Sequence, residues 1–179
     1  MLKITIPSRE MFNEKTQEFF TTKEYTLQLE HSLVSISKWE AKWNIPFLSK
    51  EQKSIEQTLD YIRCMNITQN ISDDVFNYLT NENIKEINAY IDSPMTATTF
   101  SKANDKKNNE VITSELIYYW MIALNVPMEC QKWHINRLLT LIRICNIKNA
   151  PAKKMSPREV MSRNAALNAA RRQKFHTSG

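Results

Sequence analysis

The chain has 179 residues and a formal net charge of +5, with 42% hydrophobic and 24% charged residues. These proportions are typical of a globular protein and exclude an intrinsically disordered chain. The one glycine is Gly179, so glycine-rich phosphate loops and dinucleotide fingerprints are also excluded. Turns must instead use Asn, Asp, Ser and Pro, which favours helices joined by capped loops over a sheet of hairpins.

Two segments with alternating apolar residues predict a small N-terminal antiparallel β hairpin. They are residues 2–6 (Leu-Lys-Ile-Thr-Ile) and residues 25–29 (Tyr-Thr-Leu-Gln-Leu). Two phenylalanines at residues 19–20, after a turn near residues 13–16, are candidates for a third strand. This N-terminal region is the only part of the chain in which we expect β structure.

Helical spacing of apolar residues begins at Ser32 and continues to an Asn-Ile-Pro corner at residues 44–46. A second helix is expected to begin at Ser49, because Gln52 completes a capping box with it. Its buried stripe would consist of Ile55, Leu59, Ile62 and Met65. We expect these two helices to form a helical hairpin.

Two shorter helices are expected next. Ser72 precedes a helix that runs to Leu79, and Thr80 caps another helix with Ile84, Ile87 and Ile91 on one face. Residues 95–110 are rich in Thr, Asn and Lys without periodicity, so they predict a mobile loop.

Two further helices complete the folded part of the chain. The first, capped by Thr113 or Ser114, is apolar on nearly every side, which predicts the most buried element. Its apolar run, residues 116–124, is too short to span a bilayer. The second is a long helix over about residues 128–146.

A pattern in the first helical hairpin recurs later in the chain. Residues 32–67 contain a Trp, an Asn-Ile-Pro corner and an Arg-containing helix. Residues 113–147 contain the same three features, with Asn-Val-Pro at the corner. This recurrence suggests two similar hairpins packed about a pseudo-twofold axis. Chance matching in a chain rich in Ile and Asn is the alternative.

The C-terminal segment is strongly basic. Residues 148–179 hold eight Lys and Arg against one Glu, a net charge of +7, which leaves residues 1–147 at −2. A capping box at Ser156 opens a helix over about residues 160–174 that has few large apolar residues and is therefore poorly stable alone. Either an acidic protein or a nucleic acid could order it, whereas a solubilising tail is the alternative. The candidate contact residues are Lys153, Lys154, Arg158, Arg163, Arg171, Arg172, Lys174 and Phe175.

Taken together, the patterns predict a mainly α fold of α+β type. Residues 1–150 form one domain of helical hairpins with its β hairpin in residues 1–30, and residues 151–179 form a basic helical tail. The N-terminus has no apolar stretch of signal-peptide length, so we expect a cytosolic protein that is not embedded in a membrane.

Candidates for metal or catalytic chemistry are few. Cys130 and His134 are four residues apart, a spacing that allows two side chains on a helix to reach one metal, and Cys145 follows on a similar stripe. With no second ligand pair, we expect a packed core face and reduced, buried thiols instead, and no metal or cofactor. His31 and His176 lack a local catalytic signature, so we expect no enzyme.

The four tryptophans could be read as a stacking platform for nucleic-acid bases. They are Trp39, Trp43, Trp120 and Trp133. Their apolar neighbours favour packing in the core.

Three phrases of the sequence, in residues 29–40, 131–139 and 162–172, carry a resemblance to a known family. They read Leu-Glu-His-Ser-Leu-Val-Ser-Ile-Ser-Lys-Trp-Glu, Gln-Lys-Trp-His-Ile-Asn-Arg-Leu-Leu and Ser-Arg-Asn-Ala-Ala-Leu-Asn-Ala-Ala-Arg-Arg. With these phrases, nearly the full length of the chain resembles the tail assembly chaperones of tailed bacteriophages.

The resemblance implies a helical, non-enzymatic protein of the host cell cytoplasm. Such chaperones bind the tape-measure protein and tail tube subunits during assembly, and many exist in a second, frameshift-extended form. Apolar grooves between helices would bind the partner, with Met128, Met155, Met161 and Phe175 as candidate contacts. A homo-oligomer is possible. The alternatives are a nucleic-acid-binding phage protein that uses the basic tail and a structural component of the virion.

Overall fold

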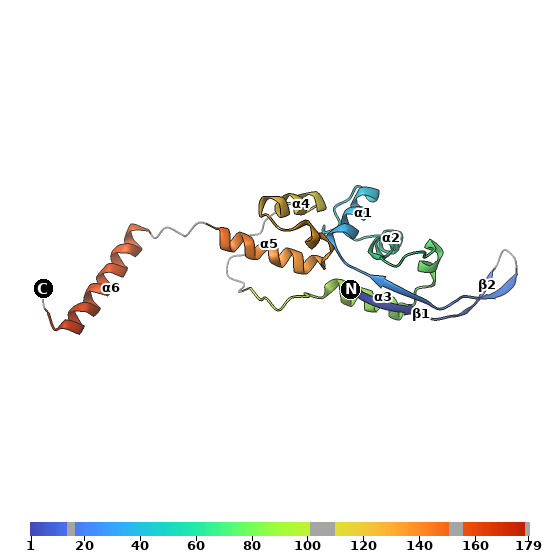
Figure 1. Ribbon diagram of the computed structural model, residues 1–179, viewed down its shortest axis with the longest axis horizontal. Coiled ribbons are helices and arrows are strands. Elements are labelled where there is room, and N and C mark those ends of the chain that lie inside the picture. The colour runs from blue at the N-terminus through green and yellow to red at the C-terminus, as the bar shows by residue number, and fades with distance from the viewer. Residues whose placement is uncertain (14–16, 101–109, 151–155, 178–179) are drawn as a thin grey trace. The chain divides into compact units, whose positions relative to one another are not determined.

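The computed structural model describes residues 1–13, 17–100, 110–150 and 156–177 (Figure 1). The chain divides into two compact units, Met1–Asn146 and Ile147–Gly179. The predicted mainly α fold with an N-terminal β hairpin is confirmed. In chain order the described elements are β1 (Leu2–Ile6), β2 (Glu10–Asn13), β3 (Glu18–Thr21), β4 (Tyr25–Leu29), α1 (Leu33–Trp43), α2 (Ile55–Met65), η1 (Asp73–Tyr78), α3 (Asn81–Asp92), α4 (Ser114–Ala123), η2 (Met128–Lys132), α5 (Ile135–Asn149) and α6 (Pro157–Phe175).

The strands form two antiparallel pairs along one hairpin. β1 pairs with β4 so that Ile4 lies opposite Leu27, and β2 pairs with β3 so that Phe12 lies opposite Phe19. Both predicted strands are therefore confirmed, and residues 19–20 lie in β3. Of the turn expected near residues 13–16, residue 13 belongs to β2 and the rest lies outside the described residues.

The second strand pair continues the first away from the helices, as the strands of Figure 1 show. The backbone N–H of Thr22 donates to the Arg9 carbonyl at 2.8 Å, and the Arg9 N–H donates to the Thr22 hydroxyl at 2.9 Å. Only the β1–β4 part buries its apolar residues, which include Ile4 and Leu27. The β2–β3 part instead leaves its phenylalanines exposed.

The predicted hairpin of α1 and α2 is present, but α2 begins later than the sequence suggested. Ser54 and Gln57, not Ser49 and Gln52, form the capping box. Both pairs fit the same motif, and the tertiary structure selects the second, because the Trp39 indole donates to the Gln57 carbonyl at 2.8 Å.

This shift explains a second correction, at the first residue of α2. Ile55 was assigned to the buried stripe, but its side chain is 82% exposed, whereas Ile62 and Met65 are buried as predicted. A buried carboxylate also joins the two helices, because Asp60 of α2 accepts from the Trp43 indole at 2.9 Å and from the Lys42 amine at 2.5 Å.

Residues 72–92 follow the sequence prediction closely. The short helix after Ser72 is the 3-10 helix η1, and Thr80 caps α3 with its side chain on the Asn83 N–H. Asn83 in turn donates to the Thr5 carbonyl at 3.1 Å, which attaches α3 to β1. The loop expected over residues 95–110 contains neither helix nor strand at residues 95–100 and 110, and the rest lies outside the described residues.

The expectation that the apolar helix, α4, is the most buried element was wrong. Thr113 caps it, but only Ser114, Ile117 and Met121 are buried, while Tyr119 is 64% and Ile122 67% exposed. α4 packs against α1 on one side. Tyr118 is partly buried and its hydroxyl donates to Gln131 of η2 at 2.9 Å, so the exposed side of α4 is the one with Tyr119 and Ile122.

The prediction of one long helix over residues 128–146 was also wrong, because η2 and α5 are separate helices. Trp133 between them has an extended backbone with φ −74° and ψ 159°. At this point the chain pairs with the start of α1: Ser32 and His134 form an antiparallel bridge, and the Ile135 N–H donates to the His31 carbonyl at 2.7 Å. This pairing competes with helical hydrogen bonding and breaks the helix.

The two Asn-containing corners share one backbone feature. Asn44 has φ 55° and Asn125 φ 53°, both in the left-handed region that Asn tolerates better than most residues. The side chain of a Ser or Thr caps the helix before each corner. These observations support the comparison of residues 32–67 with 113–147, whose pseudo-twofold relationship stays a hypothesis.

Buried residues of the first unit form a single hydrophobic core. It contains the inward residues of β1 and β4 and faces of α1 to α5, and its largest fully buried side chain is that of Trp39. The other three tryptophans are half-buried against it. No helix among the described residues is both long enough and apolar enough to cross a membrane.

Candidate partner-binding surfaces

The second unit contains α6, the helix that carries the predicted partner contacts. Ser156 caps its start in a capping box with Glu159, and Pro157 is its first residue. The Ser156 backbone and side chain hydrogen bonds lower the pKa of the Glu159 carboxyl, which keeps that cap ionised. His176 ends the helix in the left-handed conformation. The predicted capping box is confirmed.

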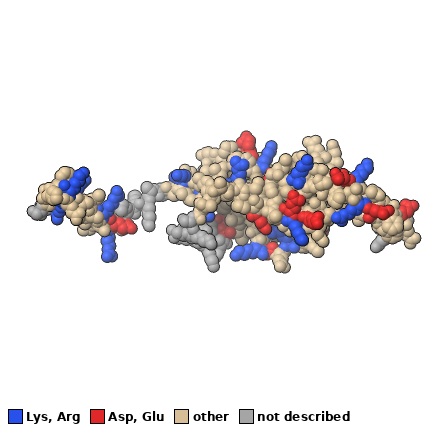
Figure 2. Space-filling model, turned by 90° about the horizontal axis from the view of Figure 1, so that it is seen from below, with Lys and Arg blue, Asp and Glu red and all other residues tan. Residues whose placement is uncertain are grey.

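No side chain of α6 is buried. Every predicted contact from Arg158 to Phe175 is exposed, whereas Lys153 and Lys154 lie outside the described residues. Figure 2 shows Lys and Arg side chains spread over this segment with little acidic surface. The helix has five Lys and Arg and one Glu, so it presents a basic surface to any partner.

The large apolar residues of α6 gather on one side of the helix. At 3.6 residues per turn, Val160, Leu167 and Phe175 fall within about a third of the circumference, with Arg171 among them. Their side chains are 40%, 48% and 66% exposed, respectively. Three methionines were expected to contact a partner in apolar grooves between helices. Met161 is 73% exposed and Met128 is 44% exposed, and Met155 lies outside the described residues.

A second apolar surface, which the sequence prediction missed, lies on α4. Tyr119 and Ile122 are three residues apart on the exposed side, one turn and two turns after Glu115. The sequence signal for this surface was that the helix after Thr113 has apolar residues on nearly every side. That pattern predicts the most buried element, whereas the fold leaves the side with Tyr119 and Ile122 exposed.

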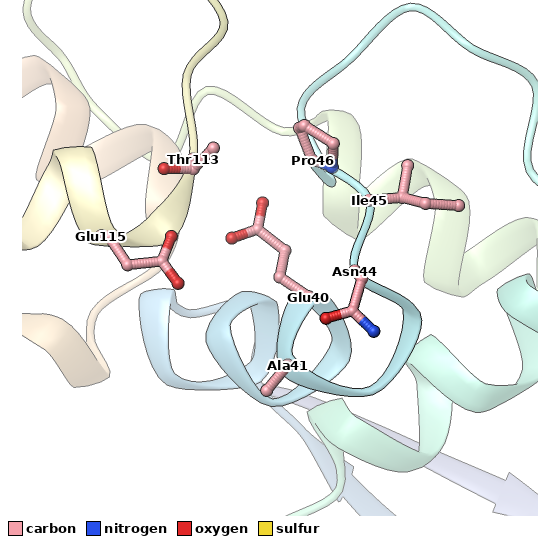
Figure 3. Close-up of a pocket in the computed structure, with 7 residues that line it drawn as sticks. All are labelled: Glu40, Ala41, Asn44, Ile45, Pro46, Thr113 and Glu115. Carbon is pink, nitrogen blue, oxygen red and sulfur yellow. The ribbon is translucent and has the colours of Figure 1, made fainter.

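A hollow of about 250 Å³ lies beside the N-terminus of α4 (Figure 3). The carboxylates of Glu40 and Glu115 both point into it. Glu40 is 7% exposed, and its two oxygens accept from the backbone N–H groups of Phe47 and Ser114, each at 2.7 Å. The lining residues are Glu40, Ala41, Asn44, Ile45, Pro46, Thr113 and Glu115.

The β2–β3 hairpin is a third exposed apolar surface. Phe12 and Phe19 pack across the strands with ring centroids 5.0 Å apart, and their side chains are 50% and 70% exposed. Phe20 is 40% exposed. Residues 19–20 were a candidate strand from the sequence, but the sequence prediction missed the partner strand β2, which contains Phe12.

The predicted pair of Cys130 and His134 does not lie on one helix face, because Trp133 interrupts the helix between them. Both residues are buried, whereas Cys64 and Cys145 are half-buried, so the expectation of buried thiols holds for Cys130 alone. Burial raises the pKa of the Cys130 thiol. No group of three or more His, Cys, Asp or Glu suited to a metal occurs among the described residues.

The remaining histidines occupy different environments. His31 contacts the Tyr61 hydroxyl through Nδ1 in the core, and burial, with a smaller effect of His134, lowers its pKa to about 3. Burial raises the pKa of the Tyr61 phenol, so this pair is neutral near pH 7. His176 lies at the end of α6 and is exposed.

One of the half-buried tryptophans, Trp133, has an arginine over its ring. The Arg137 guanidinium lies 4.3 Å from the ring centroid of Trp133. The exposed features described above are a basic helix, an apolar stripe on α4 and an aromatic hairpin. No family model, no curated protein and no solved structure matches the chain.

Proposed function

We propose that this chain is a non-enzymatic assembly chaperone of a bacteriophage tail, which binds the tape-measure protein and tail tube subunits in the host cell cytoplasm. The proposal joins the resemblance of residues 29–40, 131–139 and 162–172 to a property of α6. That helix has 19 residues, is capped at both ends and buries none of its side chains.

The proposal depends on one observation, that α6 is a capped helix with no buried side chain. An isolated helix gains little from capping alone, and most helical stability in proteins comes from packing an apolar face. Leu167 and Phe175 would supply that packing on a partner, and the surrounding cations would select an acidic one. A segment that orders on its partner suits a protein that must later release it.

Co-expression with the tape-measure and tube proteins encoded beside it, followed by pull-down, tests the proposal. We expect the tape-measure protein to be recovered with the chain and to be lost when Leu167 and Phe175 are both changed to Asp. Ile55→Asp on α2 is the matched control, because Ile55 is 82% exposed and lies in the first unit. Recovery of neither protein, or the chain as a stoichiometric part of purified virions, would contradict the chaperone role.

A second candidate function is nucleic-acid binding through α6. The five Lys and Arg of the helix favour it, because cations that neutralise phosphates give affinity independent of base sequence. Such binding to duplex DNA would weaken steeply between low and moderate salt. Binding that is strong and salt-dependent, without recovery of the tape-measure protein, would favour this function over the chaperone.

A further inference from the structure

The exposed stripe of α4 has an acidic end and an apolar end. Glu115, Tyr119 and Ile122 follow one another at four and three residues, the spacing of one helix face. Tyr119 and Ile122 are 64% and 67% exposed. Apolar residues in this arrangement are the anchors by which one helix recognises another.

The hollow at the acidic end is suited to a cation. Glu40 and Glu115 point into it, and no Lys or Arg is among its lining residues (Figure 3). The two hydrogen bonds to Glu40 occupy one lone pair on each oxygen, so its carboxylate can still accept from a guanidinium. An Arg between two carboxylates would form charge-assisted hydrogen bonds in a partly enclosed site.

The charge of the surrounding sequence favours a basic partner. Residues 111–127, which contain α4, include Glu115 and no Lys or Arg, and η2 adds both Glu129 and Lys132. A helix that covers the stripe therefore meets negative charge at its Glu115 end, and a basic side chain at that end is complementary to it.

α6 has the complementary pattern. Leu167 and Arg171 are four residues apart, the same separation as Tyr119 and Glu115. When α6 lies antiparallel along α4, Leu167 meets Tyr119 at the register in which Arg171 reaches Glu115. Val160 then lies two turns away from Leu167, toward the end of α4 that contains Ile122.

We infer that α6 of a second copy of this chain binds antiparallel on the exposed stripe of α4, with Leu167 on Tyr119 and Arg171 in the hollow between Glu40 and Glu115. Each copy offers one α4 stripe and one α6, so mutual exchange of the helices closes a dimer. The inference does not rest on the proposed function, although a partner that binds α6 would compete with this association.

Sedimentation velocity of the full chain, at about 1 to 100 µM and low salt, tests the association, because this range detects micromolar affinities. We expect a concentration-dependent dimer. Ile122→Glu should weaken it by about tenfold or more. The matched control Ile55→Glu changes another exposed isoleucine, on α2, and should leave the dimer unchanged. A monomer throughout, or equal loss in both variants, would overturn the inference, with circular dichroism used to verify folding of each variant.

A charge exchange tests the register and the identity of the occupant. Glu115→Arg and Arg171→Glu should each weaken the dimer by about tenfold when studied alone. An equimolar mixture of these two variants pairs Arg at position 115 with Glu at position 171 of the other copy, so heterodimers should form more tightly than either variant alone. Lys174→Glu on the same helix serves as the control for net charge. No recovery in the mixture would overturn the inference that Arg171 of a second copy occupies this hollow.

Discussion

The imidazoles of His31 and His134 meet edge to face with ring centroids 5.0 Å apart, although they come from the two ends of the folded unit. Nε2 of His134 lies 3.0 Å from the Tyr90 carbonyl and its Nδ1 accepts from the Asn136 N–H, so the ring is the neutral Nε2–H tautomer. Burial lowers the pKa of both histidines. The contact therefore joins two neutral rings.

This pair predicts that acid destabilises the fold. For His31 the pKa is about 3 in the folded state against 6.5 unperturbed, so its contribution to stability is complete above pH 6.5 and is lost progressively down to about pH 3. Each histidine adds a slope of up to about 1.4 kcal/mol per pH unit. Urea unfolding should give a lower free energy of unfolding at pH 5 than at pH 7.5.

The control for this experiment is His176→Gln, because His176 is exposed at the end of α6. His31→Gln should lower stability at pH 7.5 but reduce its dependence on pH. An identical dependence on pH in wild type and His31→Gln would exclude His31 as the source.

Glu40 predicts a strong effect on stability from a single carboxylate. It is 7% exposed and joins the corner after α1 to the start of α4 through the N–H groups of Phe47 and Ser114. Glu40→Ala should lower the free energy of unfolding by about 2 to 4 kcal/mol, because two N–H groups lose a charged acceptor. Glu40→Gln keeps one acceptor oxygen and should cost less.

Urea unfolding of both Glu40 variants would be compared with Glu86→Ala, which removes an exposed carboxylate from α3. Equal, small effects of all three substitutions would show that the bridge contributes nothing beyond surface charge.

The left-handed corners predict how substitutions at Asn125 rank. Its φ of 53° is costly for residues with a Cβ and free for Gly. Asn125→Ala should therefore destabilise the chain by about 1 kcal/mol, while Asn125→Gly should be neutral or slightly stabilising. Asn88→Ala in the exposed middle of α3 should instead stabilise slightly, since Ala has the higher helix propensity. Thermal unfolding measures all three, and the reverse order at Asn125 would contradict the backbone assignment.

Hydrogen exchange of the full chain at low protein concentration should separate the two units. α6 buries no side chain, so its amides should exchange within about tenfold of the unfolded rate. Amides of Ile4 and Leu27, which are paired in the buried strands, should be protected by the global free energy of unfolding. Strong protection of α6 at dilution would mean that it has a partner within the same chain.

Local signals in the sequence were sufficient for most elements of the fold. Alternation located β1 and β4, apolar spacing located the start of α1, and caps at Thr80 and Ser156 located two more helix starts, because these signals depend on a few neighbouring residues. The basic, unpacked character of α6 also followed from composition, since a helix with few large apolar residues has little to bury.

The tertiary structure decided what local patterns left open. Two capping boxes competed at the start of α2, and the contact of Trp39 with Gln57 selected the second. Pairing of residues 31–32 with 134–135 divided one expected helix into η2 and α5.

The exposed stripe of α4 depended on the same long-range packing. An apolar pattern records that a helix can be buried, whereas its neighbours in space determine which sides are. Sequence alone therefore determined most helix positions and the charge of α6, because these depend on local patterns and composition. Only the fold left Tyr119 and Ile122 at the surface, because packing decides which sides of a helix are covered.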